Sequence, residues 1–395
     1  MRHVLTIIYQ PSTSISQFTN HHSQFTIPQI LFLTLKVFSA TGGIEKVCRV
    51  MGKALYEYGI EKDICVEIMS MHDQQKQADR NPYFPKRMFS GFAVKKASFI
   101  VEAVRTGAKA DVVIISHINL LVAGWLAKKL NPNVKVILLA HGIEIWGKLS
   151  PYKKKLLTCC NDILCVSRFT AEKIKANQNL PFTNIEVLNN CIDPFLPLPD
   201  ASFSDALLQK KYSIPNDHFV LMTLTRLSER DRYKGYDCVL ESLLLLKKKE
   251  HKIKYVLAGG YSHSEKAFID DLIKKYGLEE NVVLTGYIDE DDLTAHFCMA
   301  DIYVMPSTKE GFGIVFIEAM YYGVPVIAGN QDGSTDALLN GELGLLIEPN
   351  NAPAIAEAVE KMMFNKSFYK PNHALLMENF GYDAYKRKLE TILNN

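Results

Sequence analysis

Short, almost unbroken apolar runs, separated by segments with helical periodicity, constrain the fold of this chain more than any other feature. A strand with one face in water alternates apolar and polar residues; these runs do not, so each is expected to be buried on both faces. Strands of this kind form parallel sheets covered by helices, in a doubly wound α/β fold. In the first half of the chain the expected strands are residues 30–35, 64–69, 112–116, 134–140, 163–166 and 185–188.

A cluster of prolines divides the chain. Pro194, Pro197 and Pro199 stand close together, and each restricts its own backbone and that of its predecessor, so neither a helix nor a central strand is expected there. We therefore expect a hinge at about 190–200 between two lobes, which suits 395 residues at roughly 150 per domain. A second series of strands is expected at 219–225, 254–258, 282–285, 302–305, 324–328 and 344–347, followed by a final helix at 382–393.

Composition places the chain among globular proteins, with 48% hydrophobic and 22% charged residues. Its longest apolar stretch, 112–127, contains Ser116, His117 and Asn119 and is too short and too polar for a membrane span of ~20 residues. The eight cysteines are scattered without zinc-site spacing, which is typical of reduced thiols in the cytoplasm. Residues 1–27 are interpreted as a poorly ordered extension rather than a signal peptide, because their second part is strongly polar.

Charge is distributed unevenly. Residues 1–195 carry 24 basic and 14 acidic side chains, a net +10, whereas residues 196–395 carry 21 and 29, a net −8. The basic half could face nucleic acid, anionic lipid or a phosphorylated substrate, or could carry only scattered solvated lysines. The segment 86–109 mixes basic and apolar residues and the run 153–155 adds three lysines. Both suit peripheral contact with an anionic membrane, and equally a solvated face around a sugar-binding groove.

The segment 306–320 is the most informative about function. It leads from an expected buried strand through Gly311 and Gly313 into a helix, and its glycines let the backbone approach a ligand closely. The amides at the helix start are unpaired donors that suit a phosphate. Glu310 and Glu318 flank them, and carboxylates accept hydrogen bonds from sugar hydroxyls. A nucleotide-sugar matches this arrangement; alternatively, the two acids are ordinary residues of a helix terminus and a helix surface.

The pattern Glu-Gly-Phe-Gly-x4-Glu-Ala-Met at 310–320, with Pro-Ser before it and Gly-Val-Pro-Val-Ile after it, resembles the GT-B glycosyltransferases of family 4, also called group 1. The resemblance covers residues 28–393. It implies two Rossmann-like lobes facing a central cleft, here an acceptor lobe at 28–195 and a nucleotide-sugar lobe at 196–375, with the C-terminal segment 376–395 packing back on the first lobe. It also implies that Glu310 contacts the donor sugar and Glu318 the ribose.

Further donor-site residues follow from the same resemblance. Arg226 and Lys234 would grip the diphosphate, and His141 would lie near the donor sugar and the reacting centre. Alternatively, Arg226 and Lys234 are surface cations on a charged loop, and His141 is a structural histidine. His141, Glu310, Arg226 and Lys234 form the expected catalytic group. The resemblance adds the following donor-binding residues: Gly42, Gly43, Gly311, Phe312, Gly313, Ile314 and Val315.

Two more loops are expected at the same edge of the second sheet. Residues 332–336 would add polar contacts or form a helix-capping turn. Residues 286–288 follow another strand end, where the resemblance places the nucleotide base. The sequence does not discriminate between bases.

The resemblance implies a retaining hexosyltransferase that uses GDP-mannose or a UDP-hexose. Its acceptor would be a saccharide or lipid-linked saccharide in polysaccharide, lipopolysaccharide or glycolipid assembly. No cofactor, catalytic metal or nucleic acid is expected, and the cytoplasm, including the inner face of its membrane, is the expected location. A nucleotide-sugar epimerase and a catalytically silent sugar-nucleotide-binding protein are the alternatives. An oxidoreductase is disfavoured because no G-x-G-x-x-G follows the first strand.

Overall fold

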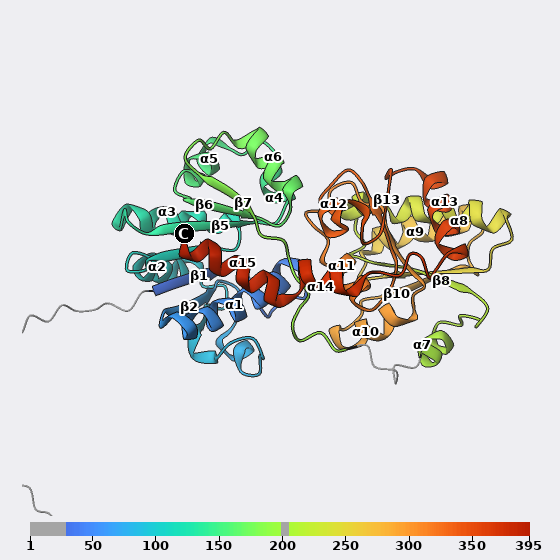
Figure 1. Cartoon of the computed structure of the whole chain (residues 1–395), viewed down its shortest axis with the longest axis horizontal. Coiled ribbons are helices and arrows are strands. Elements are labelled where there is room, and N and C mark those ends of the chain that lie inside the picture. Colours follow the sequence, from blue (N-terminus) through green and yellow to red (C-terminus); the bar gives the residue numbers. More distant parts are fainter. Residues whose placement is uncertain (1–28, 199–204) are drawn as a thin grey trace, which may run out of the picture.

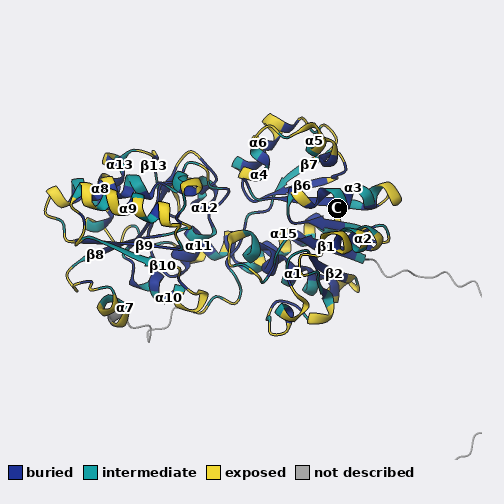
Figure 2. Ribbon diagram, turned by 180° about the vertical axis from the view of Figure 1, so that it is seen from behind, coloured by how far each residue is buried: buried dark blue, intermediate teal, exposed yellow. Residues whose placement is uncertain are grey.

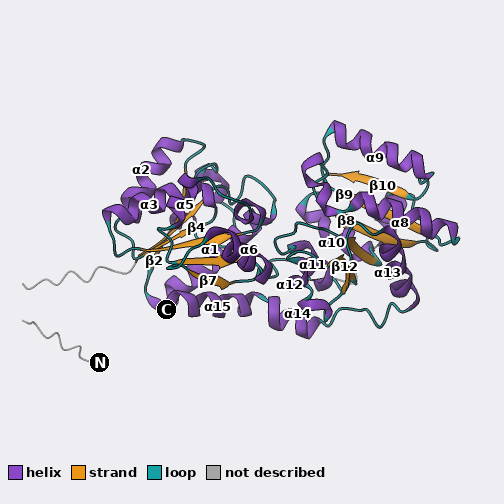
Figure 3. Cartoon of the chain, turned by 90° about the horizontal axis from the view of Figure 1, so that it is seen from above, coloured by secondary structure: helices purple, strands orange, loops and turns teal. Residues whose placement is uncertain are grey.

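The computed structural model describes residues 29–198 and 205–395, so the extension expected at 1–27 lies outside the described residues. The chain forms two parallel sheets with helices on both faces of each, which confirms the predicted α/β fold (Figures 1 and 3). Every strand expected from the sequence is present. No helix in the described ranges is long and apolar enough to cross a membrane.

The first sheet and its helices, called the first lobe below, have the strand order β3-β2-β1-β4-β5-β6-β7. The strands are β1 (Gln29–Thr34), β2 (Cys65–Ser70), β3 (Phe89–Gly91), β4 (Val112–Ile115), β5 (Lys135–Ala140), β6 (Asp162–Cys165) and β7 (Asn184–Val187). The helices between them are α1 (Gly43–Lys62), α2 (Lys96–Gly107), α3 (Leu121–Leu130), α4 (Ile143–Trp146), α5 (Pro151–Leu157) and α6 (Arg168–Gln178).

Burial on both faces explains the unbroken apolar runs. In β1, Leu31 and Leu33 pack into the core cluster beneath α2 and α3, whereas Phe32 between them packs into the cluster beneath α1. Figure 2 shows the strands as a dark, buried layer inside partly exposed helices. The strand β3 was not expected from the sequence. It has only three residues at the sheet edge, pairs with β2 and contains Ser90 and Gly91, so no apolar run marks it.

The second lobe is built on a sheet with the order β10-β9-β8-β11-β12-β13. Its strands are β8 (Phe219–Leu224), β9 (Ile253–Ala258), β10 (Val282–Gly286), β11 (Ile302–Met305), β12 (Val326–Gly329) and β13 (Leu345–Ile347). Its helices are α7 (Asp205–Lys211), α8 (Tyr236–Lys248), α9 (His263–Tyr276), α10 (Glu290–Met299), α11 (Ile314–Tyr321), α12 (Ser334–Ala337), α13 (Ala352–Phe364) and α14 (His373–Phe380).

The last helix, α15 (Tyr382–Asn394), returns to the first lobe and lies along it beside α1 (Figure 1). We expected the returning segment to begin at residue 376, but the chain crosses at Gly381. Phe380 is buried in the second lobe with its ring 5.4 Å from that of Phe312, and this contact keeps α14 on α11. The two segments that connect the lobes, the expected hinge and the end of α14, contact each other. The Ile192 amide in the hinge donates to the Phe380 carbonyl at 2.8 Å.

Candidate functional site

The predicted site residues lie in loops that follow the carboxyl ends of the strands, where ligands bind in open α/β sheets. His141 follows β5 of the first lobe, and the loop from Pro306 to Gly313 follows β11 of the second. The two loops touch across the cleft. A Cβ placed on Gly311 would lie 1.9 Å from the carbonyl oxygen of His141, so only glycine permits this approach.

The loop between β11 and α11 is held in place by a buried carboxylate. Asp332 accepts hydrogen bonds from the Ser307 hydroxyl at 2.8 Å, the Glu310 amide at 2.6 Å and the Ser334 amide at 2.9 Å. Burial raises the pKa of Asp332, and these donors act in the opposite direction. The loop ends at Gly313, whose φ of 89° lies in the left-handed region that favours glycine. The hydrogen bonds of Asp332 therefore hold the Glu310 loop in its conformation.

Replacing Asp332 by alanine is expected to lower the free energy of unfolding by about 2–4 kcal/mol, because three donors lose a buried charged acceptor. Urea unfolding followed by circular dichroism measures the change. Asp271→Ala is the matched control: this carboxylate is exposed on α9, and its loss is expected to change stability by less than about 0.5 kcal/mol. Coincident unfolding curves for the two variants would contradict the stabilising role of Asp332.

The start of α11 offers backbone donors to a ligand. The amides of Ile314 and Val315 donate no hydrogen bond to any group in the described part of the chain, as expected for the first turn of a helix. They are the unpaired donors predicted from the sequence. The Phe312 side chain is buried in the core, so this residue can meet a ligand only through its backbone.

Two predicted cations lie beside this loop. The Lys234 ammonium pairs with the Glu310 carboxylate, and both side chains are only 16% exposed. Burial alone would lower the pKa of Lys234, but the Glu310 carboxylate outweighs it and the pKa is raised, so the lysine is charged. Arg226 is more open, with 79% of its side chain exposed and its guanidinium held by Asp231 at 2.7 and 3.1 Å.

Backbone contacts hold these loops together. The Thr308 amide donates to the Tyr233 carbonyl at 2.9 Å. Gly235, with φ 79°, leaves room for the Pro306 carbonyl, which a Cβ would meet at 2.5 Å. Lys234 is thus placed against Glu310 by the packing of the two loops.

The first lobe contributes His141 and the start of α1. The His141 ring donates from Nε2 to the Ser116 carbonyl at 2.8 Å, which fixes the tautomer in the neutral state and leaves Nδ1 as an acceptor. Gly42 caps α1 and Gly43 begins it. A Cβ on Gly43 would lie 3.7 Å from the Ile314 side chain of the second lobe.

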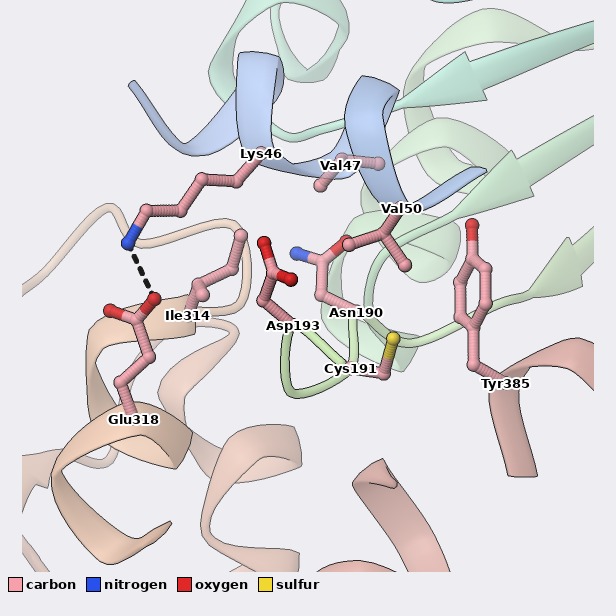
Figure 4. Close-up of a pocket in the computed structure, with 9 residues that line it drawn as sticks. All are labelled: Lys46, Val47, Val50, Asn190, Cys191, Asp193, Ile314, Glu318 and Tyr385. Atoms are coloured by element: carbon pink, nitrogen blue, oxygen red, sulfur yellow. Dashed lines mark hydrogen bonds and ion pairs between the residues drawn. The ribbon is translucent and has the colours of Figure 1, made fainter. Parts of the chain in front are cut away.

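Glu318 is the predicted residue whose surroundings differ most from expectation. It is buried in α11 and pairs at 2.5 Å with Lys46, which reaches across from α1 (Figure 4). Lys46 was not among the residues expected at the site. The available signal was its position one turn after Gly43 on the same helix face. Glu318 therefore lies at the cleft, but with a first-lobe partner.

Two parallel-sheet lobes whose carboxyl edges face one another, with a cluster of free amides and cations at one edge, define the GT-B class of sugar-transferring enzymes. Family comparison agrees over most of the chain: the model described as "Glycosyltransferase Family 4" matches residues 41–195, and the one described as "Glycosyl transferases group 1" matches residues 205–387. The chain belongs to the group 1, family 4 glycosyltransferases.

Several characterised proteins are similar to this chain. A GDP-mannose-dependent α-(1-6)-phosphatidylinositol monomannoside mannosyltransferase from Mycolicibacterium smegmatis is 29% identical over 276 residues, with 67% of each chain covered. The capsular polysaccharide biosynthesis glycosyltransferase CapM from Staphylococcus aureus is 27% identical over 60% of this chain and 58% of its own length. The chain thus spans about two thirds of the first relative and less of the second.

A solved structure shows the same fold. HepE from Anabaena, crystallised with UDP and glucose, superposes with a TM-score of 0.75 at 18% identity, covering 93% of this chain and 99% of HepE. At this identity the likeness establishes the architecture of the two lobes and no more. The particular donor and acceptor of the present chain have to be argued from its own site.

Proposed function

We propose that this glycosyltransferase moves a hexosyl group, with retention of configuration, from GDP-mannose or a UDP-hexose to a saccharide or lipid-linked saccharide in cell-surface polysaccharide or glycolipid assembly, at the inner face of the cytoplasmic membrane. The observation that carries the proposal is the cluster formed by Lys234, Glu310 and the free amides of Ile314 and Val315. It places positive charge and acidic hydrogen-bond acceptors side by side, as a sugar linked to a diphosphate requires.

The members of this cluster have different roles in holding the donor. An ammonium has three donors; Glu310 takes one from Lys234 and leaves two for phosphate oxygens. Arg226 and the amides at the start of α11 add further positive potential. The acceptor oxygen would bond to the anomeric carbon as the bond from that carbon to the phosphate oxygen breaks. The leaving diphosphate would take the acceptor proton, so the protein acts by positioning and by stabilising negative charge.

The acceptor would enter from the first lobe. His141 offers Nδ1 there, and His117 lies nearby with a pKa lowered by burial, which leaves it neutral at pH 7. The capsular and phosphatidylinositol-mannoside names of the relatives support a polysaccharide or lipid-linked acceptor. The exposed side chains of Lys95, Lys96 and Val101, at the start of α2 and within it, support peripheral contact with anionic lipid.

The test is a panel of nucleotide-sugars without acceptor. The protein would be incubated with GDP-mannose, UDP-glucose and other UDP-hexoses, and both thermal shift and release of nucleoside diphosphate would be followed. We expect one donor to stabilise the protein and to be hydrolysed slowly. A folded sample that responds to none of them would overturn the proposal.

EDTA is expected to leave the rate of donor hydrolysis unchanged. Lys234 and Arg226 supply the positive charge that a divalent cation would otherwise bring to the leaving diphosphate. The rate with EDTA should be compared with the rate after Mg²⁺ or Mn²⁺ is added back. Activity that disappears with EDTA and returns with the metal would contradict this assignment of the two cations.

A further inference from the structure

The ion pair between Lys46 and Glu318 joins the two lobes beside the donor site. Lys46 lies in the first turn of α1, and Glu318 lies in α11 of the opposite lobe. Figure 4 shows the lysine extending across the gap to one carboxylate oxygen, Oε1, which it meets at 2.5 Å. The lysine side chain is 14% exposed and the glutamate side chain 2%. The pair is therefore largely removed from water and neutral as a unit.

The second carboxylate oxygen of Glu318 is not satisfied. Oε2 is buried and has no hydrogen-bond partner among the described residues. A buried carboxylate oxygen left in this way costs free energy, and such an atom calls for an explanation in a native protein. Oε2 can only accept a hydrogen bond, so the missing partner must be a donor.

The chemistry of the pair restricts what that donor can be. A second cation would add net positive charge in a buried place, and a phosphate would be repelled by the carboxylate. A neutral hydroxyl satisfies Oε2 without changing the charge. Another contact between the lobes brings the Thr41 and Tyr287 hydroxyls to 3.2 Å, and Tyr287 belongs to the loop where the resemblance places the nucleotide base. The family resemblance implies that the donor ribose lies at Glu318, and a ribose hydroxyl is a neutral donor of this kind.

We propose that Lys46 is a positioning residue of the donor site, which holds the Glu318 carboxylate from across the cleft so that Oε2 accepts a hydrogen bond from a ribose hydroxyl. This inference rests on the proposed function. Because the two charged residues belong to different lobes, the ribose is recognised in full only when the cleft is closed. Lys46 thereby links donor recognition to closure.

The test compares ribose recognition with and without Lys46. Binding of GDP and UDP, and of their 2′,3′-dideoxy counterparts, would be measured by calorimetry. For whichever base binds, the wild-type protein is expected to bind the dideoxy compound about tenfold or more weakly, as for loss of a hydrogen bond to a charged group. In Lys46→Met the penalty is expected to shrink to about twofold or less, because the unpaired carboxylate no longer stays in place.

Two further variants make the result specific. Lys62→Met removes an exposed lysine at the end of the same helix and is expected to keep the full penalty. Lys46→Gln can still donate to Glu318 without a charge and is expected to show an intermediate penalty; it also replaces Lys46→Met if circular dichroism shows that variant to be unfolded.

Two outcomes would overturn the inference, and a third would overturn the function on which it rests. An unchanged penalty in both Lys46 variants would show that the lysine does not act on the ribose. Tighter binding of the ribo and dideoxy compounds alike in those variants would show that Lys46 blocks the site. Failure of the wild-type protein to bind either GDP or UDP would instead overturn the proposed function itself.

Discussion

Replacing Lys234 by alanine is expected to lower turnover by about 10²–10³-fold, the effect of losing roughly 2.7–4 kcal/mol of transition-state stabilisation. Its ammonium is shielded from solvent and paired with Glu310, so its charge is weakly screened at the point where a leaving diphosphate gains charge. Arg226→Ala should lower turnover by a smaller factor, because that side chain is 79% exposed and its charge is screened by water.

Single-turnover rates with the donor identified by the panel would measure the effect. Lys266→Ala is the matched control: this lysine lies on α9 of the same lobe, and its side chain is 42% exposed and pairs with the nearby Asp270. Thermal unfolding of each variant separates a loss of chemistry from a loss of fold. Near-normal turnover in both Lys234→Ala and Arg226→Ala would contradict the assignment of these residues to the diphosphate.

The second large effect is expected for Gly311→Ala. The added methyl group would lie 1.9 Å from the His141 carbonyl oxygen, which belongs to the backbone of the opposite lobe. Neither backbone can give way locally, so the cleft should close less far. A misplacement of about 1 Å can cost around 10²-fold in rate, and we expect a loss of that order in turnover. The two lobes should remain folded, because the clash lies between them.

Turnover and small-angle scattering with bound nucleoside diphosphate would be measured together. The expected result is a slower enzyme whose radius of gyration stays larger than that of the wild type in the presence of nucleotide. Gly147→Ala serves as the control, because a Cβ there meets nothing within 4 Å. A Gly311→Ala variant with wild-type turnover and compactness would show that the lobes need not approach this closely during the reaction.

The fold was predictable because both sheets are buried on both faces, which leaves a strong signal in the sequence. The runs at 30–35 and 302–305 correspond to β1 and β11 within one residue. The strand β3 was missed because three residues at an edge, including a glycine, carry no comparable pattern. The boundary at 376 was placed too early, since local sequence does not reveal that Phe380 packs against Phe312.

The site was predictable where its residues are close in sequence. Glu310, Gly311, Gly313 and the start of α11 are brought together by one short loop, and a strand followed by glycines and a helix is readable as a motif. Lys46 was missed because its partner Glu318 lies 272 residues away. Asp332 was expected to add polar contacts to the site or to form a helix-capping turn. The structure shows that it supports the Glu310 loop and also accepts from the Ser334 amide, where α12 begins.

The place of α15 has a consequence for how the protein is made. Tyr385, Leu389 and Ile392 fill the same core cluster as Phe32 in the first strand of the chain. Domains usually fold in the order in which the ribosome releases them. Here the first lobe emerges first, yet part of its interior is supplied by α15, which is translated only after the whole second lobe. During synthesis the apolar face of the first lobe stays uncovered until α15 has been made, so the second lobe can complete its folding before the first.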